Sequence, residues 1–327
     1  MPLFATALAL STGDAGGAER RAVAPVLFAT YADDAGSLEN TRLLALSLRT
    51  FGGAHREAPI RLYLPQGFAP AESDTLKALR DLGVEVRTSG WPEGADWFFY
   101  GPKPYAAAQA EADARDEAGI LAWLDDDTVV LQEPGEFLLP GGKSLGYRPV
   151  MHRNIGLLYQ DPLDAFWGRI FELLPVPGAS LFPVVTPADG DTLKPYINAG
   201  CLAVRPERGL FARWAECFTT LFRDSLLTDM CRADRPKRIF IHQAALAGAV
   251  LTHLSRDEMS ELSDRVNYPI FFQQMFGAKR TFNDITGVVT FRHESFFRDP
   301  PPDWERELQG PADRRAWIKA NLVPRSR

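Results

Sequence analysis

Short apolar runs alternate with longer segments of mixed polarity along the first part of the chain. Residues 26–30 are apolar and lie between Pro25 and a pair of aspartates, a pattern typical of a buried strand. In the segment 38–51, leucines recur at helical spacing, and two glycines then end the pattern. The same reasoning predicts further strands over 60–64, 84–87 and 120–124, and helices over 71–82 and 106–118. Strands and helices in alternation favour an α/β fold with a mainly parallel sheet.

The composition changes beyond Pro134, where prolines and glycines become frequent. Such residues mark loops, so we place a boundary near residue 135. It separates a first half, 1–135, from a second half, 136–327, and we expect the two to abut within one compact domain. A Pro-, Phe- and Gly-rich stretch, 176–195, is a candidate lid over a bound substrate, because long loops in compact enzymes tend to be functional.

The charge balance narrows the classes of partner. The chain has 327 residues, of which 24% are charged, and a formal net charge of -6. Nucleic acids and anionic membranes attract clustered Lys and Arg, so this balance argues against both and favours a small or locally recognised substrate. No apolar run approaches the roughly 18 to 20 residues that span a bilayer, so we expect no integral membrane association.

The three cysteines, Cys201, Cys217 and Cys231, form no CxxC motif. An odd number without that spacing suggests neither a disulfide framework nor a zinc site, and the reduced cytoplasm is the expected location. The first ten residues are apolar but lack the basic start of a secretory signal, so we interpret them as mature sequence.

Three consecutive carboxylates, Asp125 to Asp127, lie between two apolar runs. They follow a predicted strand, and ligands collect at the carboxyl ends of parallel strands. Neighbouring carboxylates raise one another's pKa and are tolerated near a core mainly when a cation neutralises them. A divalent ion bound by carboxylates and substrate phosphates would do so. Asp125 and Asp127 share one side of an extended segment, whereas Asp126 points elsewhere; the alternative is a solvated acidic turn.

This run resembles the DxD motif of the GT-A glycosyltransferases, and its Leu-Asp-x-Asp-Thr form is similar to the glycogenin and galactosyltransferase-like (family 8 type) group. The resemblance implies a GT-A fold, in which a mainly parallel, twisted central sheet is flanked by helices. It also implies Mn²⁺ or Mg²⁺ that holds the diphosphate of a nucleotide-sugar donor. Carried over, Asp125 and Asp127 are the metal ligands, and Asp125 and Asp126 lie at the donor. The half 1–135 then binds the nucleotide sugar, and 136–327 forms the acceptor side.

Two later segments resemble family motifs in the same order. The segment 196–204 resembles an aromatic-x-Asn-x-Gly segment that opens onto a strand near the donor sugar, which implies a catalytic Asn198 and a donor contact at Gly200. Glycine allows close approach of the backbone, and an amide both donates and accepts hydrogen bonds; the alternative is a turn before a core strand. The segment 241–246 resembles an acid-Gln-x-x-Leu helix start and implies that Gln243 faces the sugar. A histidine stands where the acid is usual, and a packed or solvent-facing ring is the alternative for it.

The last expected element is a histidine that completes the metal shell. The strand predicted over 288–293 ends in His293, and imidazole is an acceptable ligand for Mn²⁺. The family's continuation of Gly and then Lys-Pro-Trp is missing. We expect Arg298 to replace that lysine at the phosphates and Trp304 to replace the aromatic residue.

Upstream positions complete the expected donor site. Thr30 and Tyr31 end the first strand, where the resembled enzymes receive the nucleotide base, and Tyr31 is a candidate to stack on it. Lys103 precedes an Ala-rich helix and resembles the family's basic residue near the base and diphosphate. An ordinary surface lysine is the alternative for this position.

The stereochemical course is open at this level. An inverting enzyme needs a carboxylate base on the acceptor side, for which Asp224, Asp229 and Asp284 are candidates, with Asp229 taken as the catalytic one. The resemblance favours a retaining enzyme, which needs no such base.

We therefore expect a metal-dependent glycosyltransferase that moves a sugar, with a UDP-sugar favoured as donor, to the hydroxyl of a small-molecule or glycan acceptor. One alternative is a sugar nucleotidyltransferase, but no Gly-rich basic signature follows the first strand. The other is a non-catalytic protein of the same fold that binds sugar or nucleotide, against which Asp125 and Asp127 argue. The oligomeric state is not predicted.

Overall fold

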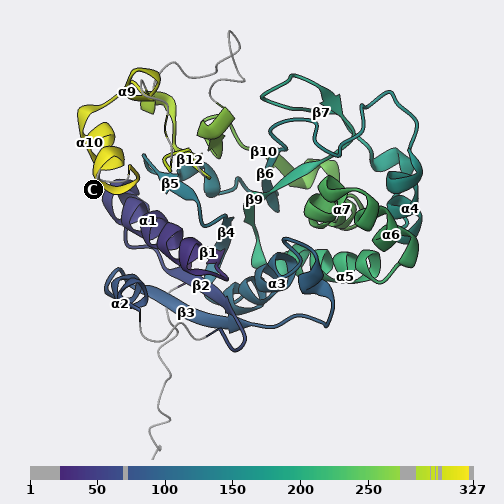
Figure 1. Ribbon diagram of the computed structural model, residues 1–327, viewed down its shortest axis with the longest axis horizontal. Coiled ribbons are helices and arrows are strands. Elements are labelled where there is room, and N and C mark those ends of the chain that lie inside the picture. The colour runs from purple at the N-terminus through teal and green to yellow at the C-terminus, as the bar shows by residue number, and fades with distance from the viewer. Residues whose placement is uncertain are drawn as a thin grey trace, which may run out of the picture.

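A seven-stranded sheet forms the centre of the computed structural model (Figure 1). The structure describes residues 23–68, 73–272, 285–294, 296–298, 300 and 304–323. The strand order is β10-β6-β9-β4-β1-β2-β3, and β9 runs antiparallel to both of its neighbours while all other pairs are parallel. The strands are β1 (Ala24–Tyr31), β2 (Ile60–Pro65), β3 (Val84–Ser89), β4 (Ala118–Leu124), β6 (Leu145–Pro149), β9 (Ile197–Val204) and β10 (Met259–Glu261). The predicted α/β fold with a mainly parallel sheet is confirmed.

Helices cover both faces of this sheet (Figure 1). Alternate residues of β1 pack against the helices on opposite faces of the sheet, because successive side chains of a strand point to opposite faces. Val26 and Phe28 belong to the core formed with α1 and α2, whereas Leu27 and Ala29 pack with α3, α5 and α7. The helices are α1 (Ala35–Phe51), α2 (Asp74–Asp81), α3 (Lys103–Ala114), α4 (Ala165–Leu173), α5 (Leu210–Phe222), α6 (Ser225–Ala233) and α7 (Arg235–His253). Both helical layers pack against the sheet through apolar side chains. The sheet is therefore a rigid support for the residues at the carboxyl ends of its strands.

Three helices begin earlier than predicted: α1 begins at Ala35 behind the Asp34 cap, and α3 and α7 each have a proline in the first turn. α3 begins at Lys103 rather than residue 106, since Pro104 suits a position whose N–H needs no helical partner, and it ends at Ala114 before the turn into β4. α7 begins at Arg235, where Asp234 caps the helix by accepting from the Lys237 N–H at 3.2 Å. The segment 241–246 therefore lies inside a helix rather than at its start.

A smaller sheet, in the order β11-β12-β5, lies beside the end of β4. Its strands are β5 (Thr128–Val130), β11 (Tyr268–Pro269) and β12 (Thr290–Arg292). β12 pairs antiparallel with β5 and places Arg292 opposite Thr128. A separate apolar cluster supports this sheet with residues from α9 (Trp304–Glu307) and α10 (Ala312–Asn321). The pairing carries a segment from near the end of the chain to the acidic run.

The boundary predicted near residue 135 falls between β5 and β6. The central sheet crosses it, because β6, β9 and β10 belong to the second half, so the division into halves stays a prediction. Within the stretch 176–195, β7 (Val184–Val185) and β8 (Thr192–Leu193) form a two-stranded sheet of their own.

The described chain contains neither a disulfide nor a helix suited to a bilayer. Cys201, Cys217 and Cys231 are buried free thiols. Among the helices of the described residues, none has the length and apolar character needed to cross a membrane.

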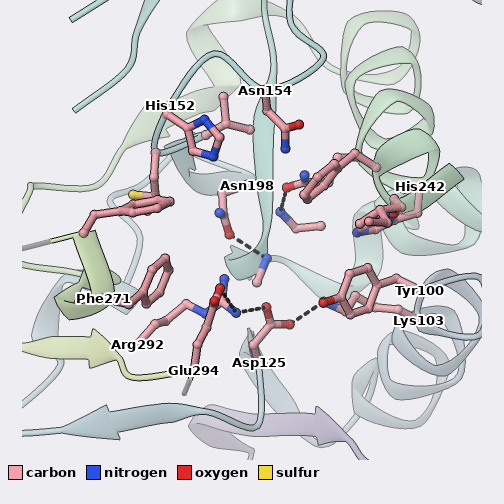
Figure 2. Close-up of a pocket in the computed structure, with 18 residues that line it drawn as sticks. Tyr100, Lys103, Asp125, His152, Asn154, Asn198, His242, Phe271, Arg292 and Glu294 are labelled. Carbon is pink, nitrogen blue, oxygen red and sulfur yellow. Dashed lines mark hydrogen bonds and ion pairs between the residues drawn. The ribbon is translucent and has the colours of Figure 1, made fainter. Parts of the chain in front are cut away.

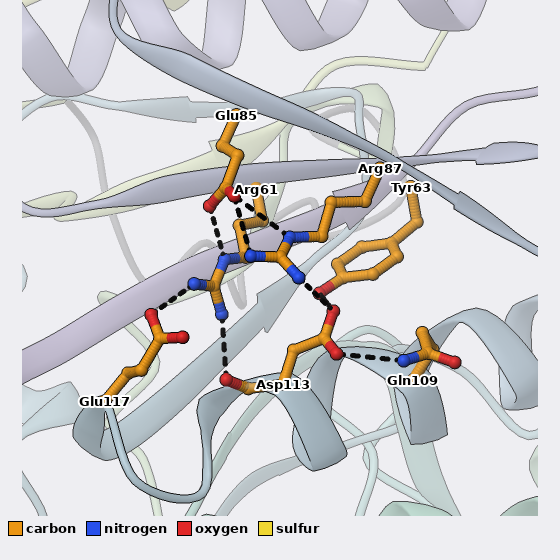
Figure 3. A network of polar contacts seen from close by, with 7 residues as sticks. All are labelled: Arg61, Tyr63, Glu85, Arg87, Gln109, Asp113 and Glu117. Atoms are coloured by element: carbon orange, nitrogen blue, oxygen red, sulfur yellow. Dashed lines mark hydrogen bonds and ion pairs between the residues drawn. The ribbon is translucent and has the colours of Figure 1, made fainter.

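A network of charged side chains ties β2, β3 and α3 together at one margin of the sheet (Figure 3). The Arg61 side chain on β2 is 3% exposed; its guanidinium donates to Glu85 at 2.8 Å and to the Asp113 carbonyl at 3.1 Å, and it pairs with Glu117. The Tyr63 hydroxyl donates to the Asp113 carboxylate at 2.9 Å. One buried arginine thus joins two strands to the end of a helix.

We expect Arg61→Met to lower the free energy of unfolding by about 2 kcal/mol, because several hydrogen bonds to a charged group are lost at once. Arg80→Met, at an exposed position of α2, is the matched control and should change it by less than about 0.5 kcal/mol. Denaturant unfolding of both variants measures the difference. Equal effects would contradict the role given to the network.

Candidate active site

The acidic run lies at the carboxyl end of β4, in the middle of the central sheet. The backbone N–H of Asp125 donates to the carbonyl of Gly200 on β9 at 2.8 Å. A methyl group at Gly200 would collide with the carboxylate of Asp125. The predicted Asn-x-Gly segment is part of β9 rather than a turn before it. Its glycine leaves space for the Asp125 side chain.

Lys103 lies against Asp125 at the first turn of α3. Its Nζ is 2.5 Å from Oδ1 of Asp125 and 4.8 Å from the centre of the Tyr100 ring. The residue is 8% exposed, so the alternative of an ordinary surface lysine is wrong. Burial alone would raise the pKa of Asp125, but Lys103 and Arg292 outweigh it and lower that pKa to about 2.

Arg292 joins the two outer aspartates. Its Nε donates to Oδ1 of Asp127 at 2.9 Å, and its Nη2 lies 3.2 Å from Oδ2 of Asp127 and 3.2 Å from Oδ2 of Asp125. Figure 2 shows Asp125 held between Lys103 on one side and Arg292 on the other. The convergence predicted for Asp125 and Asp127 is confirmed, with a guanidinium group between them.

Asp126 points to a different neighbour, as predicted. Its Oδ2 accepts a hydrogen bond from the Asn40 amide of α1 at 2.8 Å. Burial and then the charge of Asp127 raise the pKa of Asp126 to about 7. A carboxyl group with such a pKa binds a proton more readily than Asp125, whose pKa is lowered.

His293 follows β12 directly and lies next to Asp127. Its backbone N–H donates to the Asp127 carbonyl at 3.1 Å, and the residue is 5% exposed. Burial lowers the pKa of the imidazole, so the ring is neutral. Its Nε2 is buried without a hydrogen-bond partner among the described residues. A neutral ring with an unsatisfied nitrogen is the form in which histidine binds metal ions.

The donor atoms have the right chemistry for a divalent ion, although their present arrangement holds a guanidinium. Asp125 and Asp127 provide carboxylate oxygens, and His293 provides an unpaired nitrogen. Within the described parts of the chain, however, no three His, Cys, Asp or Glu side chains are arranged to hold an ion together. Arg292 occupies the space between the two aspartates instead.

Two amide side chains lie on the other side of Asp125. Asn198 accepts from the Gly200 N–H at 2.8 Å, and Gln243 accepts from the Ala199 N–H at 3.1 Å. The two residues predicted as sugar contacts therefore lie on facing elements, β9 and α7, and both are largely buried. The NH₂ group of Asn198 is a donor for a ligand hydroxyl, whereas that of Gln243 donates to the Tyr196 hydroxyl at 3.4 Å and has one N–H left for a ligand.

His242 is a packed residue and not a substitute for an acid. Its ring packs against that of Tyr100 in a tilted arrangement, with 5.1 Å between ring centres, and Nδ1 lies 2.9 Å from the Ile239 carbonyl. Burial, followed by the charge of Lys103, lowers its pKa to about 3. The ring is therefore neutral at physiological pH.

Two cavities meet at this cluster. The amide cavity, of about 270 Å³, is lined by Asn154, Asn198 and Gln243 among other residues (Figure 2). The aspartate cavity, of about 390 Å³, is lined by the three aspartates of the run. The residues that line both are Tyr100, Lys103, Asp125, Arg292 and Glu294. The two cavities are therefore neighbours that share part of their wall, which includes Asp125 and Arg292.

The remaining donor candidates fall on the aspartate cavity, except for one. Thr30, Tyr31 and Arg298 line it. Trp304 packs edge to face with Phe297, at 5.6 Å between ring centres, inside the apolar cluster under the small sheet. It therefore supports the fold at this point and does not replace an aromatic ligand contact.

The structure brings neither Asp224 nor Asp229 to either cavity. Asp229 is exposed on α6 and pairs with Arg232 at 2.7 Å, one helical turn away. Asp224 caps the start of α6 and pairs with Arg169 at 2.7 Å. Asp284 lies outside the described residues. The catalytic role predicted for Asp229 has no support in this geometry.

Sequence reasoning did not identify Arg292 and Glu294 as site residues. Arg292 lies in the quoted segment before His293, but no local pattern connects it with aspartates far back in the chain. Glu294 has a φ of 42°, unusual for a residue other than glycine, and its N–H donates to Oδ2 of Asp127 at 3.0 Å. The signal that identifies both is the pairing of β12 with β5, which appears only in three dimensions.

The chain belongs to a glycosyltransferase family. The family model described as the Rhodobacterales glycosyltransferase domain matches residues 32–253, about two thirds of the chain. The prediction of a glycosyltransferase, made from the acidic run and the segments after it, is confirmed by this match. No curated protein matches the sequence.

Solved glycosyltransferase structures have a similar chain path. The galactosyltransferase LgtC, in complex with donor and acceptor sugar analogs, is 15% identical, with 92% of this chain and 97% of that chain covered and a TM-score of 0.47. Core-mannan synthase A of Aspergillus fumigatus, in its Mn/GDP form, is 8% identical, with 74% of this chain and 73% of that chain covered and a TM-score of 0.45. GlyE of Streptococcus pneumoniae is 14% identical, with 92% of this chain and 61% of that chain covered and a TM-score of 0.42. These similarities do not identify a donor or an acceptor for this chain.

Gly200→Ala is expected to displace Asp125 from Lys103 and Arg292 and to lower the free energy of unfolding by about 1 to 3 kcal/mol, a cost typical of overpacking. Gly119→Ala on the neighbouring strand β4 is the matched control, since a methyl group there meets its nearest atom at 3.5 Å. Denaturant unfolding compares the two. If both substitutions have the same small effect, the close approach at Gly200 is not a constraint.

Proposed function

We propose that this glycosyltransferase is a metal-dependent enzyme of the GT-A type, which transfers a sugar from a nucleotide-diphosphate sugar to an acceptor hydroxyl. The observation that supports it best is the meeting of two cavities at Asp125 and Arg292. Transfer needs a donor and an acceptor held at one point, and orientation of two reactants accounts for a large part of enzymatic rate enhancement. A UDP-sugar is the favoured donor, on the resemblance of the acidic run to the galactosyltransferase-like group.

The aspartate cavity suits the donor. Thr30 and Tyr31 line it at the end of β1, where an aromatic ring can stack on a base. Lys103 and Arg298 line it as well and are cations that can pair with phosphate oxygens. These residues come from separate elements that the central sheet holds at its carboxyl end.

Asp125, Asp127 and His293 are the residues that would hold a divalent ion. When bound, the ion would neutralise charge on the diphosphate as it leaves the sugar. Lys103 has a complementary role, because a fixed ammonium group beside the leaving group stabilises the same developing charge. The protein thus provides both the carboxylates for the ion and a permanent cation.

The amide cavity suits a neutral acceptor. Asn154, Asn198 and Gln243 provide amides that donate and accept hydrogen bonds, and Phe271 contributes an apolar wall. His242 is neutral, so it adds no charge to this side. Such a lining favours a sugar or another polyhydroxylated molecule over an ionic one.

We propose retention of the anomeric configuration. Asp224 and Asp229, which an inverting enzyme could have used as a base, are paired with arginines away from both cavities. Proton NMR of a fresh transfer product should therefore show the anomeric configuration of the donor. Inversion would contradict the proposal and would direct attention to Glu294, the carboxylate that lines the amide cavity beside Asp125.

A thermal unfolding screen tests the donor class. UDP, GDP, CMP and TDP are each added with Mn²⁺, with Mg²⁺ or with a chelator. We expect one nucleotide, with UDP favoured, to raise the melting temperature only when a divalent ion is present, because a ligand that binds the folded state stabilises it by about 2.7 kcal/mol at 100 times its Kd.

Two Asp→Asn variants serve as controls for this screen. Asp127→Asn keeps the shape of the side chain but removes a carboxylate, so it should lose the metal-dependent rise. Asp229→Asn, on the exposed side of α6, should keep it. If none of the four nucleotides raises the melting temperature of a protein that remains folded, the result would count against a nucleotide-sugar donor.

A further inference from the structure

Each oxygen of the Asp125 and Asp127 carboxylates has a partner within the chain itself. Oδ1 of Asp125 accepts from Lys103 at 2.5 Å, and Oδ2 forms an ion pair with Nη2 of Arg292 at 3.2 Å. Oδ1 of Asp127 accepts from Nε of Arg292 at 2.9 Å, and its Oδ2 accepts from Nη2 of Arg292 at 3.2 Å and from the Glu294 N–H at 3.0 Å. Every carboxylate oxygen of the pair is therefore already engaged in a hydrogen bond or an ion pair.

The charges of this cluster are already paired. Two carboxylates face one ammonium and one guanidinium group, and the guanidinium, which stays protonated at any pH a protein meets, also lies 3.7 Å from the Glu294 carboxylate. A divalent ion placed on the oxygens of Asp125 and Asp127 would bring two more positive charges to carboxylates that already have cationic partners. The ion and Arg292 therefore compete for the same position.

We propose that Arg292 is a displaceable counter-ion, which occupies the metal position until a nucleotide diphosphate arrives with the ion. This inference rests on the metal dependence proposed above. Arg292 lines both cavities, so a diphosphate in the aspartate cavity offers it new anionic partners. Guanidinium groups bind phosphate oxygens in a bidentate manner, so the exchange keeps every charge paired.

The exchange couples the two ligands. A nucleotide diphosphate that draws Arg292 away raises the affinity for the ion, and the ion must raise the affinity for the nucleotide by the same factor. The free protein consequently has a weak metal site, in agreement with the absence of a three-ligand cluster among its described residues. Arg292 is thus a positioning residue that makes metal binding depend on the donor.

Calorimetric titration with Mn²⁺ tests whether Arg292 competes with the ion. The wild type and Arg292→Gln are titrated first with Mn²⁺ alone and then with UDP present. Without UDP, the variant should bind Mn²⁺ about tenfold or more tightly than the wild type, within the range of typical coupling factors. With UDP, the difference between the two proteins should shrink. For the titration without UDP, Arg298→Gln is the matched control, because it removes the same charge from the aspartate cavity and leaves the contacts of Arg292 in place.

Thermal unfolding provides a second readout that does not depend on transfer activity. In chelator, Arg292→Gln should melt below the wild type, since Asp127 then lacks its counter-ion while Asp125 keeps only Lys103. Mn²⁺ should restore the melting temperature of the variant and change that of the wild type much less. Arg292→Lys keeps a positive charge without the planar fork and should be intermediate, which keeps the test informative if the glutamine variant folds poorly.

The outcomes separate the two proposals. If the wild type binds Mn²⁺ in the presence of UDP but Arg292→Gln binds Mn²⁺ alone no more tightly than the wild type, Arg292 is a structural ion-pair partner and the exchange is wrong. If neither protein binds Mn²⁺ with or without UDP, the metal dependence itself fails, and the exchange fails with it. Tighter binding by Arg292→Gln together with rescue by Mn²⁺ supports both.

Discussion

Neutralisation of two buried aspartates at the end of β4 is the constraint on which the site depends. Carboxylates removed from water are unstable without a partner, and both cations come from distant segments. Lys103 is brought by the first turn of α3, and Arg292 is brought by the pairing of β12 with β5. The small sheet thus places the positive charge of Arg292 beside Asp127, and this charge stabilises the buried carboxylate.

Much of the fold could be predicted from the sequence, because its signals are local. Strands β1, β2 and β4 are short, mainly apolar runs with clear ends, and the acidic run follows the last of them. Motifs that lie in order along the chain also single out Gly200 and Gln243, although the contact of Gly200 with Asp125 and the hydrogen bond of Gln243 to β9 appear only in the structure. Where a proline lies in the first turn of a helix, as in α3 and α7, composition and motif resemblance gave a start several residues late.

The rest of the site could not be predicted, because it depends on contacts between segments far apart in the sequence. Arg292 reads as one more residue of an apolar strand until β12 is paired with β5. Asp229 has the right chemistry for a base, but the helical spacing to Arg232 turns it into a surface ion pair. Sequence patterns give residue types at plausible positions; only packing decides which side chains face one another.

A largely buried pair of ionised acids needs a nearby cation, and the source of that cation has consequences. If it comes from solution, the site is complete only when the ion is bound, and the empty form carries uncompensated charge. If it comes from the chain, the fold is stable without an ion, but an ion that binds there must displace a group that is already well paired. Asp125 and Asp127 receive their cations from the chain. In the exchange proposed for Arg292, stability in the free state and selectivity for an ion that arrives with its phosphate ligand would be two results of one arrangement.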